Sequence, residues 1–163
     1  MVPNAVAVLL VLSQAAQPAP AASPAPQARP EIAAEVEKAT RAYNAQDLAY
    51  YQSALAPDAF YIADDGMLFA GKERVVGLFT RIFGRTPKPQ LEVSDVVTGG
   101  RGDTAWARFN WTLSGIERSR PGVATAVFVR SGTAWQVVSI QNTGRGHAMP
   151  SAAASASPAP HKH

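Results

Sequence analysis

The sequence offers few of the side chains on which catalytic and metal sites are usually built. It contains no cysteine, and its three histidines, His147, His161 and His163, all lie near the C-terminus. The missing thiols exclude disulfides, thiolate metal sites and cysteine nucleophiles. A Ser-His-Asp triad or a multi-histidine zinc site would lack its histidine inside the fold. We therefore expect no metal and no cofactor, which leaves carboxylates, phenols, hydroxyls and amides to do any chemistry.

The strand predicted over 104–115 has an apolar face that could line a binding pocket. Alternation puts Phe109 and Trp111 on one side of this strand, and hydrophobic burial assigns that side to the interior. Trp106 and Arg108 fall on the outer side, where a solvated strand should be polar. Because Trp and Arg are enriched at interfaces, these two residues predict a homodimer through the convex face of the sheet. The alternative is that Trp106 lies flat on a solvated sheet.

Three helices are predicted ahead of the longer strands. Pro30-Glu31 opens the first helix with the favoured proline and acid, and apolar residues at three- and four-residue spacing continue to Tyr43. Asp47 is a typical N-cap for a short second helix over 48–56, which turns Tyr51 inward. Gly71 leads an apolar third helix.

The rest of this middle region alternates between apolar strands and turns. A strand over 59–63 is followed by the turn Asp64-Asp65-Gly66 and a return over 67–70. Longer strands follow over 90–98, 104–115, 122–130 and 133–143, with glycine-rich turns at 99–103 and 131–132. This order predicts an α+β fold, with three N-terminal helices packed on a strongly curved, mainly antiparallel sheet.

Composition divides the chain into four segments. An apolar run followed by Ser13-Gln14-Ala15 resembles a secretory signal peptide over 1–16, although no Lys or Arg precedes it. The run is too short for a membrane span. We expect a secreted or periplasmic protein, or a cytoplasmic one if the run is not a signal. A Pro/Ala linker over 17–30, a folded domain over 31–147 and a disordered Ala/Pro/Ser tail over 148–163 follow.

The folded domain is close to neutral. The whole chain has 15 Lys and Arg against 12 Asp and Glu, and Arg29 and Lys162 lie outside the domain. Because no basic cluster follows one helix face, we expect no nucleic-acid partner.

Three segments resemble the nuclear transport factor 2-like superfamily, in its SnoaL-like branch. Residues 43–79 show the order helix, Asp, helix, "PDA", strand, "DG" and "GK", and 102–115 and 132–144 are similar to the long central strands of that family. The resemblance covers about 31–144 and implies an α+β cone with a pocket at its wide end. This fold carries isomerases, dehydratases, cyclases, binding proteins and assembly domains, so function has to be argued from the site.

The resemblance implies one candidate catalytic residue, Asp64. A general-base aspartate ends the first strand of the steroid isomerases in this superfamily, and Asp64 matches it within one residue. The isomerase's tyrosine donor falls on Ala39, with Tyr43 one turn further as a substitute, and its buried acid falls near Ala126. The pair of oxyanion donors is therefore missing. The alternative is that Asp64 only forms a β-turn, which Asp and Gly favour.

The last strand carries the remaining candidate site residues, Ser139 and Gln141. They share a face with Trp135 and Val137, and the resemblance places that face inward, where many relatives have a histidine. An apolar cavity with these groups at its mouth suits a small hydrophobic molecule that carries one or two hydrogen-bonding groups. The alternative is a filled core. The predicted ligand-binding residues are Tyr43, Tyr51, Phe109, Trp111, Ser139 and Gln141.

Three functions follow from these patterns. The first is a ligand-binding protein with an apolar pocket. The second is a cofactor-independent isomerase, dehydratase or cyclase with Asp64 as its base. The third is a dimeric assembly module.

Overall fold

The computed structural model describes residues 27–145. The predicted signal peptide, the first part of the linker and the tail lie outside the described residues, as do all three histidines. No helix within 27–145 is long and apolar enough to cross a membrane. The elements, in chain order, are α1 Pro30–Ala45, α2 Leu48–Ala54, β1 Leu55–Ile62, β2 Leu68–Ala70, α3 Lys72–Phe83, β3 Gln90–Arg101, β4 Thr104–Ser114, β5 Arg120–Ser131 and β6 Ala134–Gly144.

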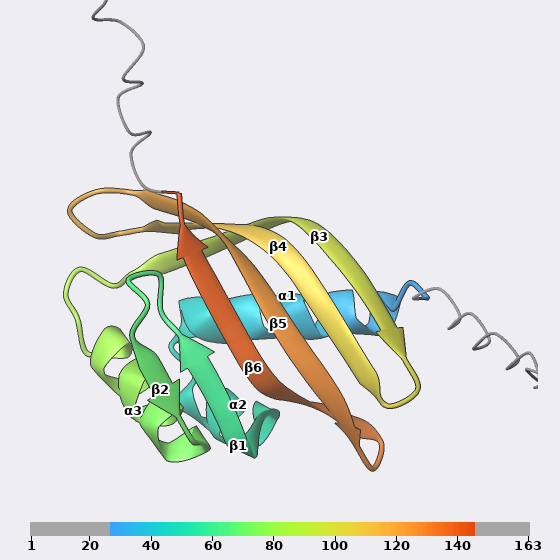
Figure 1. Ribbon diagram of the computed structural model, residues 1–163. Coiled ribbons are helices and arrows are strands. Elements are labelled where there is room, and N and C mark those ends of the chain that lie inside the picture. Colours follow the sequence, from blue (N-terminus) through green and yellow to red (C-terminus); the bar gives the residue numbers. More distant parts are fainter. Residues whose placement is uncertain (1–26, 146–163) are drawn as a thin grey trace, which may run out of the picture.

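The strands form one curved sheet with the helices on its concave face (Figure 1). The strand order is β2-β1-β6-β5-β4-β3, and every neighbouring pair is antiparallel except β1 and β6. Helix α1 packs on β3 and β4, while α2 and α3 pack together at the β1 side. This confirms the α+β class and the curved sheet, although α3 follows the β1–β2 hairpin instead of standing with the other helices at the N-terminus.

The two N-terminal helices begin where the sequence indicates, α1 at a proline and α2 at a side-chain cap. Pro30 occupies the first turn of α1, and the Asp47 carboxylate accepts the amide hydrogen of Tyr50 at 3.1 Å to cap α2. Asn44 adds an anchor that sequence analysis did not identify. Its side-chain amide donates to the carbonyl of Leu91 and its carbonyl accepts from the Leu91 amide, which fastens the end of α1 to β3.

Two predicted boundaries were wrong near Pro57 and Gly100. Helix α2 ends at Ala54, and β1 runs through Pro57. The register of β1 against β6 is irregular at Pro57, so the missing proline N–H removes no regular hydrogen bond between these strands. Gly99 and Gly100 belong to β3, and only 102–103 form the turn. Gly100 also exchanges two backbone hydrogen bonds with Gln27, so the end of the predicted linker pairs with the sheet.

One extra residue in β6 reverses the facing of its second half. Phe128 of β5 pairs with Val137, but the preceding Val127 pairs with Ser139, so Val138 has no partner of its own. This is a β-bulge, and a one-residue slip moves every later side chain to the opposite face. The predicted inward face of Trp135 and Val137 therefore ends at the bulge.

Two tryptophans of β4 lie across glycines of the neighbouring strands, on opposite faces of the sheet. A Cβ atom built on Gly122 would lie 2.2 Å from Cζ2 of Trp111, and one built on Gly99 would lie 2.5 Å from Cζ2 of Trp106. Gly122 faces Trp111 and Gly99 faces Trp106 in the strand register. The indole rings thus occupy the space that these glycines leave open.

We predict opposite effects of alanine at two glycines. Gly122→Ala should lower the free energy of unfolding by about 1–3 kcal/mol because the new methyl would collide with the Trp111 ring and with the Thr143 carbonyl oxygen, 2.6 Å away. Gly77→Ala should raise the free energy of unfolding by about 0.5–1 kcal/mol, because Gly77 is inside α3 and the new methyl would have room. The nearest atom to a Cβ built there is a guanidinium nitrogen of Arg81, 4.0 Å away. Urea unfolding measures both, and a neutral Gly122→Ala would contradict the packing described here.

Candidate functional site

A cavity of about 440 Å³ lies between the helices and the concave face of the sheet. This volume is within the usual range for small-molecule sites. Its wall is mainly aromatic and aliphatic, with charged residues from the ends of β1 and α3 and from the start of β5. The aromatic and aliphatic side chains in the wall include Tyr43, Tyr51, Tyr61, Phe69, Leu78, Phe79, Phe109, Trp111, Leu113 and Ile140.

The structure places four of the six predicted ligand-binding residues in this wall. Tyr43, Tyr51, Phe109 and Trp111 all line the cavity. Three of these side chains are less than a tenth exposed, and Phe109 is half-buried. The inward face of the strand predicted over 104–115 is therefore confirmed. That these residues bind a ligand remains a prediction.

The placement of Ser139 and Gln141 was wrong. Both follow the bulge at Val138, so they point to the outer face of the sheet, and neither lines the cavity. Ile140 and Asn142 take their places in the wall. Asn142 is fixed there because its side-chain amide donates to the carbonyl oxygen of Ile62 at 3.2 Å, which ties β6 to β1.

Phe79 holds the aromatic part of the wall together. Its ring stacks on Tyr51 with centroids 4.0 Å apart and meets Tyr61 edge-on at 5.9 Å. Edge-on contact also joins Tyr43 to Phe83, at 5.4 Å. Such aromatic pairs contribute about 0.5–1.5 kcal/mol each beyond area burial. The cluster positions the four tyrosines of the chain around the cavity.

The four tyrosine hydroxyls divide into two pairs. Tyr51 donates to the carbonyl of Ala39 at 3.0 Å and Tyr50 donates to that of Glu35 at 3.4 Å, so both fasten α2 to α1. The hydroxyls of Tyr43 and Tyr61 make no hydrogen bond to another residue within 27–145. These two phenols are the polar groups that the apolar wall leaves available.

Both available phenols stay protonated at neutral pH. Burial raises the pKa of Tyr43 to about 12, against a smaller lowering effect of the Arg85 charge. Burial also raises the pKa of Tyr61, helped by Tyr43 and opposed by Arg120. Each hydroxyl therefore keeps a proton that it can donate in a hydrogen bond, and the charge of one arginine acts on each of them.

Asp64 lies both in a turn and in the cavity wall. Residues 64–65 turn the chain between β1 and β2, as predicted. The Asp64 carboxylate pairs with the Arg120 guanidinium, passing over the space where Gly144 has no side chain. The pair engages Oδ2 of Asp64, so Oδ1 is the oxygen that could accept a proton from a bound molecule. No three Asp, Glu, His or Cys residues within 27–145 lie close enough together to hold a metal ion.

Two further arginines reach the wall from the end of α3. Arg81 lies in its last turn with the guanidinium carbon 5.9 Å from the Phe69 ring centre, and Arg85 follows the helix. Neither forms an ion pair with a carboxylate of the described residues. Lys88 donates to the Phe83 carbonyl at the C-terminal end of α3, so that end already has a cationic partner.

Sequence analysis missed the cationic half of the site. Arg120 pairs with a carboxylate 56 positions earlier in the chain, and no local pattern indicates such a contact. Arg85 lies in the segment 84–89, which predicted only the end of a helix. Tyr61 could have been found, since its alternation with Phe60 in the first strand gives it the inner face.

Comparison with known proteins gives the family and the fold. A family model described as SnoaL-like domain matches residues 32–142, and no curated protein matches. The fold is similar to that of a nuclear transport factor 2-like protein of unknown function from Pseudomonas putida KT2440, with TM-score 0.64 and 22% identity over 70% of this chain and 84% of that chain.

Two other solved structures are similar in the same way. A nuclear transport factor 2-like superfamily protein from Salmonella enterica has TM-score 0.65 and 16% identity over 76% of this chain and 94% of that one. A candidate dehydratase of that family from Streptomyces avermitilis has TM-score 0.63 and 18% identity over 70% and 94%. At these identities the structures show the fold alone. The family model, which spans most of the chain, shows that this protein belongs to the SnoaL-like domain family.

Proposed function

We propose that this domain binds a small hydrophobic molecule in the cavity between its helices and its sheet. The observation that carries the proposal is a cavity of about 440 Å³ whose wall is mainly aromatic and aliphatic. A few convergent polar groups in an apolar cavity are typical of ligand sites, and Tyr43 and Tyr61 supply them. With the signal peptide predicted over 1–16, the proposal is of an exported binding protein.

Filling the cavity should weaken the binding of a neutral hydrophobic probe. Ala126 lines the wall and is 4% exposed, so Ala126→Met would place three more heavy atoms inside. We expect the affinity for N-phenyl-1-naphthylamine, measured by its fluorescence, to fall at least tenfold. The matched control is Thr125→Met. Thr125 is exposed on the same strand, so this substitution should leave the affinity for the probe unchanged.

Thermal unfolding separates a blocked cavity from a damaged fold, because overpacking alone costs about 1–3 kcal/mol. The binding proposal fails if the wild-type protein does not bind the probe. It also fails if the folded Ala126→Met and Thr125→Met variants bind the probe equally well.

A second candidate function is proton transfer by Asp64. It is favoured by the position of this carboxylate in the wall of the same cavity that holds the Tyr43 hydroxyl, and one structure of similar fold is a candidate dehydratase. Asp64 would take a proton from the carbon next to a carbonyl, and the Tyr43 hydroxyl would donate to the resulting enolate oxygen. Returning the proton to carbon completes an exchange or an isomerisation.

Deuterium exchange into 2-tetralone tests this second function directly. If Asp64 is the base, the wild-type protein accelerates exchange in heavy water, as followed by NMR. Asp64→Asn should then abolish the acceleration and leave the affinity for 2-tetralone within about twofold, because a base acts only in the transition state. Its fold should persist, since Arg120 is half-exposed and such pairs contribute under about 1 kcal/mol. Equal loss of exchange and affinity would make Asp64 a structural residue.

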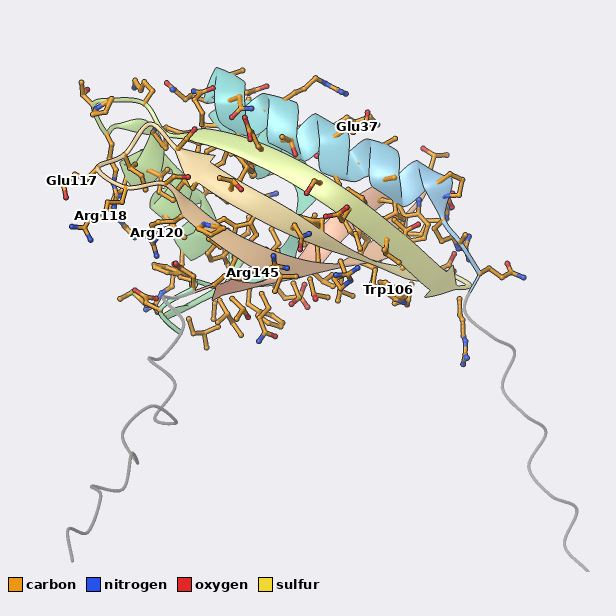
Figure 2. All side chains as sticks on the ribbon, turned by 90° about the horizontal axis from the view of Figure 1, so that it is seen from above. Glu37, Trp106, Glu117, Arg118, Arg120 and Arg145 are labelled. Atoms are coloured by element: carbon orange, nitrogen blue, oxygen red, sulfur yellow. The ribbon has the colours of Figure 1, made fainter. Side chains whose placement is uncertain are left out.

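We also propose that two copies of the chain associate through the convex face of the sheet. None of the described helices covers this face, and Figure 2 shows Trp106 on it, on the side away from α1. Phe60, Leu68 and Val97 are 39%, 55% and 45% exposed, and their register puts them on the same face. Phe60 and Leu68 lie on the two strands at one edge of the sheet and Val97 on the strand at the other edge, so association through this face would remove apolar surface from water across its whole width.

The dimer should depend on the character of Trp106. Sedimentation equilibrium of the wild-type protein is expected to give twice the monomer mass at high micromolar concentration. Trp106→Glu should give the monomer mass, because it places a charge in an apolar contact, whereas the control Trp106→Phe should keep the dimer. A monomeric wild-type protein, or a dimer that tolerates glutamate, would refute this arrangement.

A further inference from the structure

The charged groups around the cavity leave an excess of positive charge on its α3 side. The wall contains three arginines, Arg81, Arg85 and Arg120, and two aspartates, Asp64 and Asp65. Asp64 already neutralises Arg120. The Asp65 carboxylate accepts the amide hydrogen of Met67 at 2.9 Å and is exposed in its turn. Arg81 and Arg85 therefore face the cavity with no carboxylate of residues 27–145 in ion-pair range.

Two arginines and two tyrosines in the wall, Arg81, Arg85, Tyr43 and Tyr61, have hydrogen-bond donors that no residue of 27–145 occupies through a carboxylate or a tyrosine hydrogen bond. A guanidinium donates and cannot accept, and the raised pKa values of Tyr43 and Tyr61 keep both hydroxyls protonated. Asn142 donates to the Ile62 carbonyl and keeps its own side-chain carbonyl oxygen as an acceptor. A ligand that binds the two guanidiniums must bring acceptor oxygens, and an anionic oxygen matches them best.

Arg85 and Tyr43 act on the same part of the cavity. Both line the wall, and the charge of Arg85 acts on the Tyr43 hydroxyl. Tyr43 is only 6% exposed, so its hydroxyl meets the cavity from the inside, while the Arg85 side chain reaches the wall from the solvent-exposed end of α3. A carboxylate bound by both would accept one hydrogen bond from a guanidinium and one from a neutral hydroxyl.

The rest of the wall indicates the chemical character of the other end of the ligand. Phe79 and Phe109 give the wall apolar surfaces, and Leu78 and Ile82 of α3 add to them. An aromatic or branched aliphatic group suits these surfaces. Building on the proposed binding function, we infer that the ligand is a small hydrophobic carboxylic acid, whose carboxylate is bound by Arg85 and the Tyr43 hydroxyl.

Two ligands of the same shape test this inference. We would measure the displacement of N-phenyl-1-naphthylamine by 2-naphthoate and by 2-naphthamide, which differ mainly in the charge of one group. The wild-type protein should prefer the acid about tenfold, which corresponds to about 1.4 kcal/mol. Arg85→Gln should bring the preference below about twofold by weakening the acid alone. The control is Arg74→Gln, an exposed arginine of α3 outside the wall, which should keep the preference.

Tyr43→Phe gives a second readout. The amide carbonyl and the carboxylate both accept from a hydroxyl, so this variant should weaken both ligands, and the acid more, because a hydrogen bond to an ionised acceptor is the stronger one. Equal wild-type affinities for the acid and the amide would overturn the inference while the binding proposal stands. If neither ligand nor the neutral probe binds, the binding proposal fails and the inference with it. A preference that survives Arg85→Gln but is lost in Arg120→Gln would overturn the assignment to Arg85.

Discussion

The unpaired residue Val138 determines which side chains in the second half of β6 face the cavity. Up to Val137 the strand follows simple alternation, and after the bulge the inner positions belong to Ile140 and Asn142. Without the extra residue, Ser139 and Gln141 would point inside in place of Ile140 and Asn142. Because the period of a strand is two, one inserted residue changes every later side chain of β6 in the wall. The bulge therefore exchanges a hydroxyl for an aliphatic side chain and makes this part of the wall more apolar.

A second bulge shapes the opposite side of the sheet. The register of β3 against β4 shifts between Ser94 and Val97, and Asp95 there adopts a positive φ of 53°. The Asp95 carboxylate accepts hydrogen bonds from Ser94 and Asn110, which stabilises this conformation locally. Bulges bend the strand that carries them. With bends in β3 and β6, the sheet curls around the helices and encloses the cavity.

Local signals were sufficient for the elements of this fold. Pro30 and Asp47 marked the helix starts, and alternation gave the inner face of β4 correctly, because each of these patterns involves residues close in sequence. The match of Trp111 to Gly122 was beyond such reasoning. A glycine in a strand does not indicate which ring will cover it, and only the register of β4 against β5 brings the two together.

The errors at the site have a related physical cause. Alternation and the family resemblance placed Ser139 and Gln141 on the inner face of the last strand. The face on which they lie depends on a bulge, and no residue typical of turns marks its position in the sequence. The ion pair of Asp64 with Arg120 joins two strands that are separated in the sheet by β6, and it requires the missing side chain of Gly144. Burial and alternation predict apolar walls well, whereas polar contacts between distant strands depend on the final register.

The tyrosines give the strongest physical reason to regard the cavity as a binding site. Phenylalanine would make the same aromatic contacts as Tyr43 and Tyr61 with Phe83 and Phe79, since those contacts involve only the rings. Their hydroxyls add nothing to that packing, and neither is among the side-chain atoms of residues 27–145 that are fully buried without a hydrogen bond. At Tyr51, by contrast, the hydroxyl contributes to the fold through its bond to α1. The hydroxyls of Tyr43 and Tyr61 are therefore accessible from the cavity, where a bound molecule with acceptor oxygens can take the place of water.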